Sequence, residues 1–281
     1  MRRLGARGQL LRQLVLALVG VFVIAPLWSL AYMAFDRSFL GRPTEFRLLP
    51  DEFSFELFGR VLDRAAQGVP FTTLLANTLV VAGGSALLAL ACGASMAYAF
   101  ARMRFPGRRA GLFALLSGSL LPPIALVLPL YLILSVLGLR TTRLGLIVVY
   151  TAIALPFGVW NLRAAFQSVP REVEEAAAMD GAGFARTFVA ITLPLAAPAI
   201  GLAAFVAFLG GYSEFALGWM FVDRADNVTL AMGLWNAITL AGADWNFMAA
   251  YALMMCAPVV AVFIALQRGL ASGLLGGRID V

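Results

Sequence analysis

The sequence contains no lysine and no histidine, so all 21 of its basic residues are arginine. A nucleotide-binding P-loop needs the lysine of GxxxxGK[ST], and this chain therefore cannot form one. Catalytic triads and zinc sites that use histidine are excluded in the same way. An intramembrane enzyme is also disfavoured, because the apolar runs hold no paired carboxylates and no pairing of a nucleophile with a base.

Charge is scarce as well: charged residues make up only 13% of the chain, whereas hydrophobic residues make up 62%. This is the composition of a membrane protein. The net charge of +6 comes from arginines spread between apolar runs, which favours cytoplasmic loops over nucleic-acid binding. Cys92 and Cys256 both fall inside apolar runs, so we expect small buried residues and no disulfide.

Long apolar runs predict an all-α membrane protein with six transmembrane helices. The first run has 22 residues, too long for a cleavable signal peptide, so we expect it to remain as a span. The third run is interrupted by prolines and should face protein or a cavity. The expected spans are residues 14–35, 72–100, 111–137, 144–165, 195–213 and 245–267, with an interfacial helix near 54–66.

The arginines also predict the orientation. Residues 1–13 and 102–109 hold four each and the segment around 168–194 holds three, whereas 138–143 holds two and 214–243 one. The positive-inside rule therefore places both termini and the 168–194 loop in the cytoplasm. The predicted organisation is a cytoplasmic N-terminus (1–13), a first transmembrane helix (14–35), an extracytoplasmic segment (36–70), a five-helix core (72–267) and a cytoplasmic tail (268–281).

A short polar interval inside this apolar chain has the order of a capped helix. Ser168 and Pro170 suit a helix start, and three glutamates in the expected first turn complement the helix dipole. Asp180-Gly181 can end the helix, because glycine accepts the left-handed conformation. A second short helix is expected from Phe184 to about Thr192. These features alone are equally consistent with a loop helix lying on the membrane surface.

The spacing within this interval adds a resemblance. Glu-Ala-Ala is followed after three residues by Gly, then after nine by Ile, and after one by Leu-Pro. The interval resembles the EAA loop of ABC importer permeases, which forms a coupling helix that docks on a separate ATPase. The resemblance implies a type I ABC importer permease fold with coupling loop 168–194. Its implied ATPase-coupling residues are Glu175, Ala176, Ala177, Asp180, Gly181, Ile191, Leu193 and Pro194.

Tyr98, Ala99, Ala101, Arg102, Phe105, Pro106 and Gly107 follow a second pattern, YAxARxxFPG. It is similar to a stretch of carbohydrate importer permeases, and the chain looks most like the smaller membrane subunit of maltose/maltodextrin-type transporters. The resemblance implies a non-catalytic subunit in the inner membrane of a prokaryote. Its implied partners are a second permease, two ATPase subunits and an extracytoplasmic sugar-binding protein. ATP and Mg would bind to the ATPase, with no cofactor on this chain and no nucleic acid.

Two further sets of residues follow from position in that resemblance. Tyr212 and Glu214 are candidates for the substrate path, although an interfacial aromatic and a solvated acid would fit equally. The family's usual Trp-Asn-Glu is replaced here by Tyr-Ser-Glu, and the usual tail sequence differs too. The candidate contacts to the binding protein are Asp223, Arg224, Asp226 and Asn227.

The alternative function is a self-contained six-span channel or secondary carrier. Ion-coupled carriers usually place acidic residues or histidine at mid-membrane depth, and the spans of this chain have almost none. Transport by the purified chain without an ATPase would distinguish the two hypotheses. The arginines of residues 102–109 are expected to set the topology and to meet anionic lipid.

Overall fold

The computed structural model describes residues 6–38, 48–66, 68–235, 238–239 and 242–274. Helices dominate, and the chain divides into two compact units. One unit comprises Met1–Phe71 with Leu234–Ala257, and the other comprises Thr72–Gly233 with Pro258–Val281. The two units are described separately below.

The first unit contains one long apolar helix and a compact polar junction. Its elements are α1 (Ala6–Phe35), α2 (Glu56–Asp63), a hairpin of β1 (Ile238–Thr239) and β2 (Gly242–Ala243), and the start of α13 (Trp245–Leu274). The apolar side chains of α1 are widely exposed, with Phe22 82% accessible, as expected of a helix that meets lipid. A helix is present within the expected range 54–66, as α2.

Asp36 holds the polar junction of this unit together. Its carboxylate is buried and accepts hydrogen bonds from the backbone N–H and hydroxyl of Ser38 and from the N–H of Asp51. Its carbonyl oxygen accepts a 2.7 Å bond from Nδ2 of Asn246. Burial raises the pKa of Asp36, but the hydrogen bonds outweigh burial and hold the pKa below its usual value. The junction therefore connects the end of α1 to α13.

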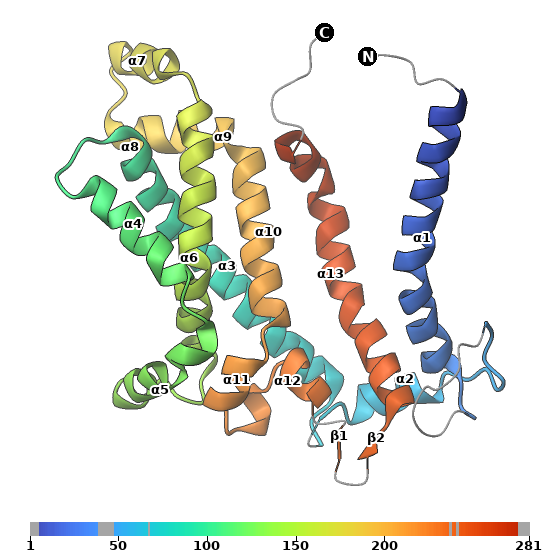
Figure 1. Ribbon diagram of the computed structural model, residues 1–281. Helices are drawn as coiled ribbons and strands as arrows, with labels where there is room; N and C mark the ends of the chain where they lie inside the picture. Colours follow the sequence, from blue (N-terminus) through green and yellow to red (C-terminus); the bar gives the residue numbers. More distant parts are fainter. Residues whose placement is uncertain (1–5, 39–47, 67, 236–237, 240–241, 275–281) are drawn as a thin grey trace. The chain divides into compact units, whose positions relative to one another are not determined.

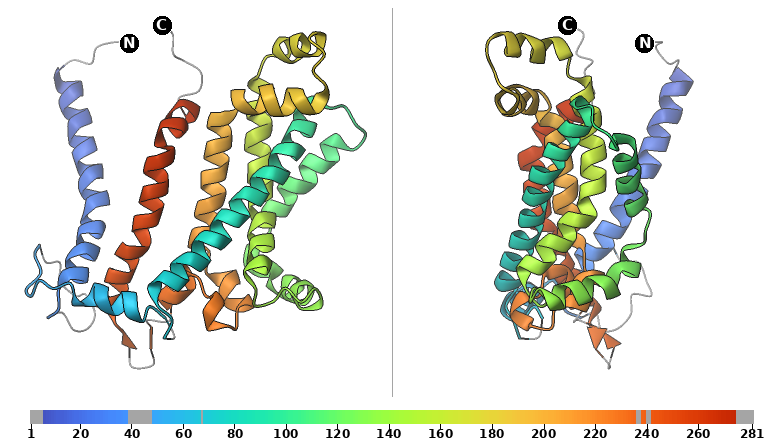
Figure 2. Two further views of the ribbon diagram at one scale, coloured as in Figure 1. Left: turned by 180° about the vertical axis from the view of Figure 1, so that it is seen from behind. Right: turned by 90° about the vertical axis from the view of Figure 1, so that its left-hand side faces the viewer.

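The second unit is a helical bundle with distinct ends (Figures 1 and 2). Its helices are α3 (Phe71–Arg102), α4 (Arg108–Ser119), η1 (Pro123–Leu126), α5 (Val127–Val136), α6 (Arg143–Ser168), α7 (Arg171–Met179), α8 (Phe184–Thr187), η2 (Phe188–Thr192), α9 (Leu193–Leu195), α10 (Ala197–Ser213), α11 (Ala216–Phe221), η3 (Ala225–Asn227) and α12 (Leu230–Trp235). Helices α7 to α9 lie at one end, and α5 and α11 lie at the other (Figure 1).

Close packing of α3, α6 and α10 forms the centre of this unit. A Cβ on Gly84 of α3 would lie 2.8 Å from Ile147, and one on Gly211 of α10 would lie 2.7 Å from Ser85. Small residues therefore allow these helices to approach closely, as in other membrane bundles. Near α7 the core is built from apolar side chains of the same helices, including Ala97, Tyr98, Leu162, Phe166 and Ala203.

Within the described residues, four helices are long and apolar enough to cross a membrane, and two bent pairs raise the number to six if each pair is counted as one span. The third span, expected over residues 111–137 with an interruption by prolines, is broken, and α4 and the η1–α5 segment meet at 100°. Pro122 and Pro123 cause the break, since neither can donate the backbone N–H that a continuous helix needs. Together with α6, the broken segment lines a cavity of about 470 Å³, as its prolines predicted.

The cysteines differ from expectation in their exposure. Cys92 and Cys256 are unpaired, as predicted, but both are exposed and not buried. Each lies on a helix that presents apolar residues outward, such as Leu87 on α3 and Val260 on α13. The error arose because apolar sequence does not distinguish a helix face that meets protein from one that meets lipid.

Candidate functional site

The short helix α7 is defined by its termini. It begins at Arg171, after Pro170, and not at a Ser168 cap: Ser168 is the last residue of α6, and its hydroxyl bonds the Ala165 carbonyl. Glu175 is consequently the fifth residue of α7, beyond the first turn. The predicted stop is confirmed, because Gly181 has φ +81°.

Two backbone bonds complete the end of α7. The N–H of Ala182 bonds the Ala177 carbonyl at 2.9 Å, and the N–H of Gly181 bonds the Ala178 carbonyl at 3.0 Å. This is a Schellman motif, which satisfies carbonyls that the helix end would leave without partners. The chain can therefore reverse direction directly after the helix.

One face of α7 is directed away from the helical bundle and is exposed. Glu175 and Ala176 are exposed, Asp180 is exposed at the helix end, and Met179 is 89% accessible. Ala177 is the buried member of the alanine triplet. The outer face therefore combines a carboxylate with small and apolar groups, and it has the chemistry of a docking surface.

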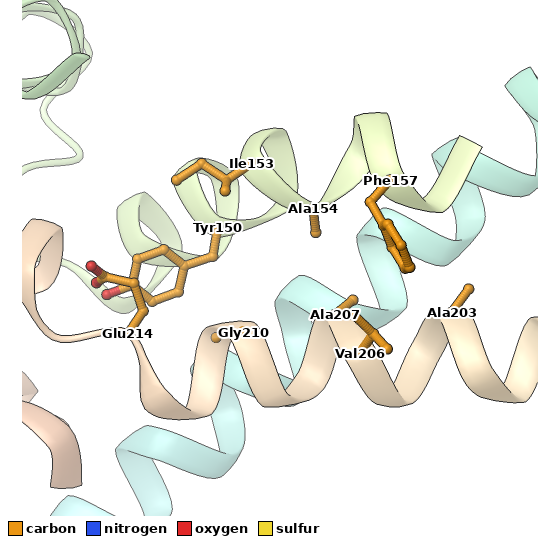
Figure 3. Close-up of a pocket in the computed structure, with 10 residues that line it drawn as sticks. Tyr150, Ile153, Ala154, Phe157, Ala203, Val206, Ala207, Gly210 and Glu214 are labelled. Carbon is orange, nitrogen blue, oxygen red and sulfur yellow. The ribbon is translucent and has the colours of Figure 1, made fainter. Parts of the chain in front are cut away.

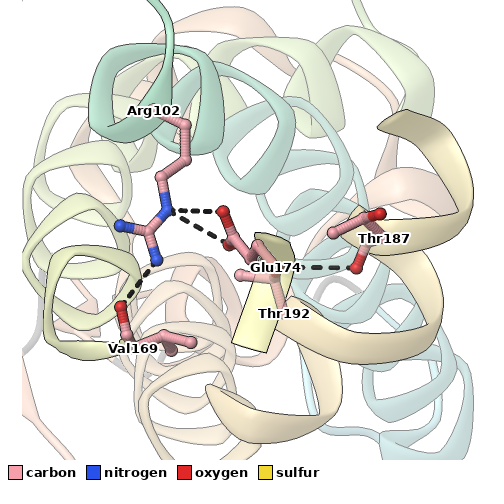
Figure 4. Close-up of polar contacts among 5 residues, drawn as sticks. All are labelled: Arg102, Val169, Glu174, Thr187 and Thr192. Carbon is pink, nitrogen blue, oxygen red and sulfur yellow. Dashed lines mark hydrogen bonds and ion pairs between the residues drawn. The ribbon is translucent and has the colours of Figure 1, made fainter. Parts of the chain in front are cut away.

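The inner face of α7 is held by an ion pair (Figure 4). Nε of Arg102 lies 3.0 Å from Oε2 and 3.1 Å from Oε1 of Glu174, and the two side chains are only 9% and 14% exposed. Arg102 also donates a 2.7 Å bond from Nη2 to the Val169 carbonyl. The Thr192 hydroxyl donates to Oε1 of Glu174 at 2.8 Å. The last residue of α3 thus contacts α7, and Glu174 in turn contacts η2.

The segment after α7 is anchored by aromatic rings. It runs as α8 and then as the π-helix η2, so the second short helix expected from Phe184 to Thr192 is confirmed. The ring of Tyr98 stacks on Phe188 at 4.6 Å and lies 5.2 Å from Phe184. Among the remaining predicted coupling residues, Ile191 and Leu193 are half-buried on this segment and Pro194 is exposed. These three residues therefore lie on the segment that follows α7 and are not part of its outer face.

A cavity of about 230 Å³ lies between α6 and α10, and Glu214 lies at one end of it (Figure 3). The Glu214 carboxylate accepts bonds from the N–H groups of Leu217 and Gly218, at 2.8 and 3.1 Å, and so caps α11. The hydroxyl of Tyr150 points toward this carboxylate (Figure 3). The rest of the lining is mostly apolar and includes Phe157.

Tyr212, the other candidate for the substrate path, is only 2% exposed. Its ring packs against Phe208 at 5.6 Å, and it is absent from the lining of the cavity beside Glu214. The structure therefore brings Glu214 to the cavity with Tyr150 and Phe157 and leaves Tyr212 in the packed interior.

The segment from Asp223 to Asn227 is fastened to the tight loop after α5. Asp223 pairs with Arg140, and Nδ2 of Asn227 donates a 2.7 Å bond to the Thr141 carbonyl. Arg224 and Asp226 are exposed. Two of the four candidate contact residues therefore have structural partners, and the other two are presented outward by the loop that those partners hold.

Sequence reasoning missed the residues that position these surfaces. Arg102 was assigned to topology and lipid, and Glu174 was read as one of several helix-start acids. Their spacing in the chain gave no signal that they would meet. Tyr150 could have been suspected, because it is a polar aromatic in an apolar span. Its neighbour in the structure could not be predicted, because packing determines which residue the Tyr150 hydroxyl meets.

The fold and the exposed helix define a multi-pass membrane protein of the transport-permease class. The chain matches the family model for the binding-protein-dependent transport system inner membrane component over residues 89–275, and it belongs to that family. Members of this family are the non-catalytic membrane subunits of ABC importers, and the chain resides in the inner membrane with several spans.

Relatives and solved structures agree with this assignment. The chain is 32% identical over 267 residues to the diacetylchitobiose uptake system permease protein NgcG of Streptomyces coelicolor, covering 94% of this chain and 86% of that one. It is 29% identical to the maltodextrin transport system permease protein MdxG of Bacillus subtilis, covering 94% and 93%. Its fold is similar to a chain of a bacterial ABC transporter involved in alginate import, with TM-score 0.78, 22% identity, and coverage of 95% and 99%.

Proposed function

We propose that this chain forms part of the translocation pathway of an ABC importer for a carbohydrate, and that α7 is its coupling helix. The observation that carries the proposal is the construction of α7. Its outer face, with Glu175 and Ala176, is exposed, whereas its inner face is fixed to the bundle through Glu174. A helix held on one side and open on the other is suited to receive a partner and to transmit its movement.

The mechanism we infer is alternating access. Closure of two ATPase subunits on bound ATP and Mg would displace α7, and the spans would reorient to accept sugar from a docked extracytoplasmic binding protein. A second permease would complete the pathway. In this arrangement α7 faces the cytoplasm, together with the arginines of residues 102–109, and the 223–227 loop faces the binding protein. This chain would bind no cofactor itself.

The cargo class rests on the relatives. Their names include diacetylchitobiose, galactooligosaccharide, maltodextrin and trehalose systems, so an oligosaccharide is favoured, with the maltose/maltodextrin type as our specific proposal. The cavity beside Glu214 would contribute to the sugar path. Its volume of about 230 Å³ is below the range usual for a complete ligand pocket, so the second permease would supply the remainder.

The coupling role can be tested on the outer face of α7. Glu175→Lys combined with Gly181→Arg should abolish ATPase association, measured by copurification from native membranes, and should stop sugar uptake. Asp63→Lys combined with Gly59→Arg makes the same charge changes on exposed positions of α2 and serves as the control for charge. Retention of both the ATPase and uptake in the α7 variant would refute the coupling role.

The wild-type copurification itself separates this function from a self-contained channel or carrier. Recovery of a second permease and an ATPase with the chain supports the importer. Recovery of the chain alone, from membranes in which a known importer stays assembled, together with transport by the purified chain in liposomes, would favour the self-contained alternative.

A further inference from the structure

Helix α3 carries a polar clamp near each of its ends. At its last residue, Arg102 binds Glu174 of α7 and the carbonyl of Val169. Near its start, Asn77 and Thr78 bind the segment that follows Asp223. All of these partners are distant in the sequence, so α3 is the element through which two remote segments are connected.

The clamp at Arg102 is geometrically restrictive. Nε of Arg102 contacts both carboxylate oxygens of Glu174, and Nη2 donates to the carbonyl of Val169. The planar guanidinium is therefore oriented by partners on two sides (Figure 4). A guanidinium provides donors in a fixed fork, which a lysine ammonium cannot reproduce. The low exposure of both side chains also makes separation of the pair costly.

The clamp near the start of α3 is made to backbone atoms. Nδ2 of the buried Asn77 donates to the carbonyls of Asp226 and Val228 at 2.7 and 2.8 Å. The hydroxyl of Thr78 accepts a 2.8 Å bond from the N–H of Leu230. These bonds fix the course of the loop itself and do not depend on its side chains.

The helix between the clamps is continuous. Asn77 and Arg102 are 25 residues apart, which at 1.5 Å per residue is about 38 Å along the helix axis. The interval contains no proline, Gly84 and Gly93 lie against α6, and Ser85 and Ala82 lie against Gly211 of α10. A helix packed in this way moves as a body more readily than it bends.

We propose that Arg102 is a positioning residue for the coupling helix, and that through it α3 carries the displacement of α7 to the loop between Asp223 and Leu230. The inference rests on the proposed function of α7. It adds a second connection to the covalent one, which runs from α7 through α10 to the loop. It thereby links the ATPase-facing helix to the loop that faces the binding protein.

The test uses the complete transporter, reconstituted with its partner permease, ATPase and binding protein. The variants are Arg102→Gln, Arg102→Lys, Glu174→Gln and the exchange of Arg102→Glu with Glu174→Arg. Arg104→Gln and Glu172→Gln are matched controls at exposed positions in the same segments. The measured quantity is the number of sugar molecules transported per ATP hydrolysed, which does not change when less folded protein is present.

We expect Arg102→Gln and Glu174→Gln to lower this ratio by about tenfold, a size typical of coupling between distant sites. The ratio in Arg102→Lys should be almost as low as in Arg102→Gln. The exchange of the two charges should recover part of the wild-type ratio. At the other clamp, Asn77→Leu should reduce the stimulation of ATP hydrolysis by the sugar-loaded binding protein, whereas the exposed control Thr72→Val should not.

The outcomes separate this inference from the function on which it rests. If the Arg102 and Glu174 variants match the Arg104 and Glu172 controls, while Glu175→Lys with Gly181→Arg still removes the ATPase, the positioning role is refuted and coupling by α7 stands. If the α7 variant also keeps the ATPase and uptake, the proposed function fails with it. Normal stimulation of ATP hydrolysis by the sugar-loaded binding protein in Asn77→Leu refutes the link to the far loop.

Discussion

The two ends of the second unit are held in different ways. At the α7 end, a largely buried ion pair and a group of aromatic rings secure a helix whose outer face stays open. At the opposite end, the loop from Asp223 to Leu230 is held by bonds to backbone atoms from Asn77, Thr78 and Asn227. The α7 end is therefore held mainly by contacts between side chains, and the loop end mainly by bonds from side chains to the backbone.

This difference has a physical consequence. Rings and a charged pair fix the position of a helix as a body but leave its outer surface available. Amide and hydroxyl bonds to the backbone fix the path of an irregular segment, residue by residue. The α7 end is suited to transmit movement, and the loop end is suited to present a surface of constant shape.

Among substitutions at the two ends, Arg102→Leu should cause the largest loss of stability. The substitution leaves Glu174, whose side chain is only 14% exposed, without its charged partner, which we expect to cost about 3 kcal/mol of stability. Thermal unfolding of the detergent-purified chain measures the loss. Leu at exposed Arg104 is the control. An unchanged melting temperature for Arg102→Leu would show that the ion pair does not secure the α7 end.

The loop end can be broken through Asn77→Leu. This change keeps the side-chain volume but leaves the carbonyls of Asp226 and Val228 without their donor, at a cost of about 2 kcal/mol. We expect faster proteolysis within residues 223–230 and no change at α7. Equal protection of the loop in the variant and the wild type would mean that backbone bonds do not hold this end.

A smaller effect is expected from Gly181→Val. A β-branched residue at φ +81° is strained by about 1–2 kcal/mol, and the Schellman motif should open. Hydrogen exchange should become faster at the end of α7 while the loop end stays protected. Gly183→Val is the control, because Gly183 has φ −72°. Equal exchange in the two variants would contradict the role of the left-handed conformation.

The smallest effect should come from the ion pair of Arg140 with Asp223, whose side chains are 35% and 60% exposed. An exposed pair contributes about 0–1 kcal/mol, so Arg140→Gln should leave the melting temperature nearly unchanged. A loss as large as that from Asn77→Leu would show that side-chain pairing and not backbone bonding stabilises the loop end.

Much of the fold could be predicted from the sequence, because membrane spans are set by length and hydrophobicity. The runs that became α1, α3, α6 and α13 were located correctly, with ends a few residues further out. The stop at Gly181 was predicted for the same kind of reason, since glycine at a helix end is a local signal. The 100° bend after Ser119 was missed, because prolines show where a helix weakens and not the direction that the chain then takes.

The candidate site was predicted less completely. Local spacing located α7 and its exposed glutamate, and it placed Glu214 at the end of a span, where the structure shows it beside a cavity. The role of Glu174 could not be distinguished from that of its neighbours, because three glutamates lie on the same short helix. Only the packing of the bundle determines which of them meets Arg102. The exposure of Cys92 was misjudged for a related reason, because lipid and protein interiors favour the same side chains.

The sequence by itself determined that this protein spans the membrane, that it hydrolyses no ATP through a P-loop of its own, and that a helix ends at Gly181. These properties depend on composition and on residues that are neighbours in the chain. Only the tertiary structure decided that Arg102 meets Glu174 and that Asn77 holds the loop after Asp223. Such contacts join residues far apart in the chain, and the packing of α3 against α6 and α10 brings them within hydrogen-bond distance.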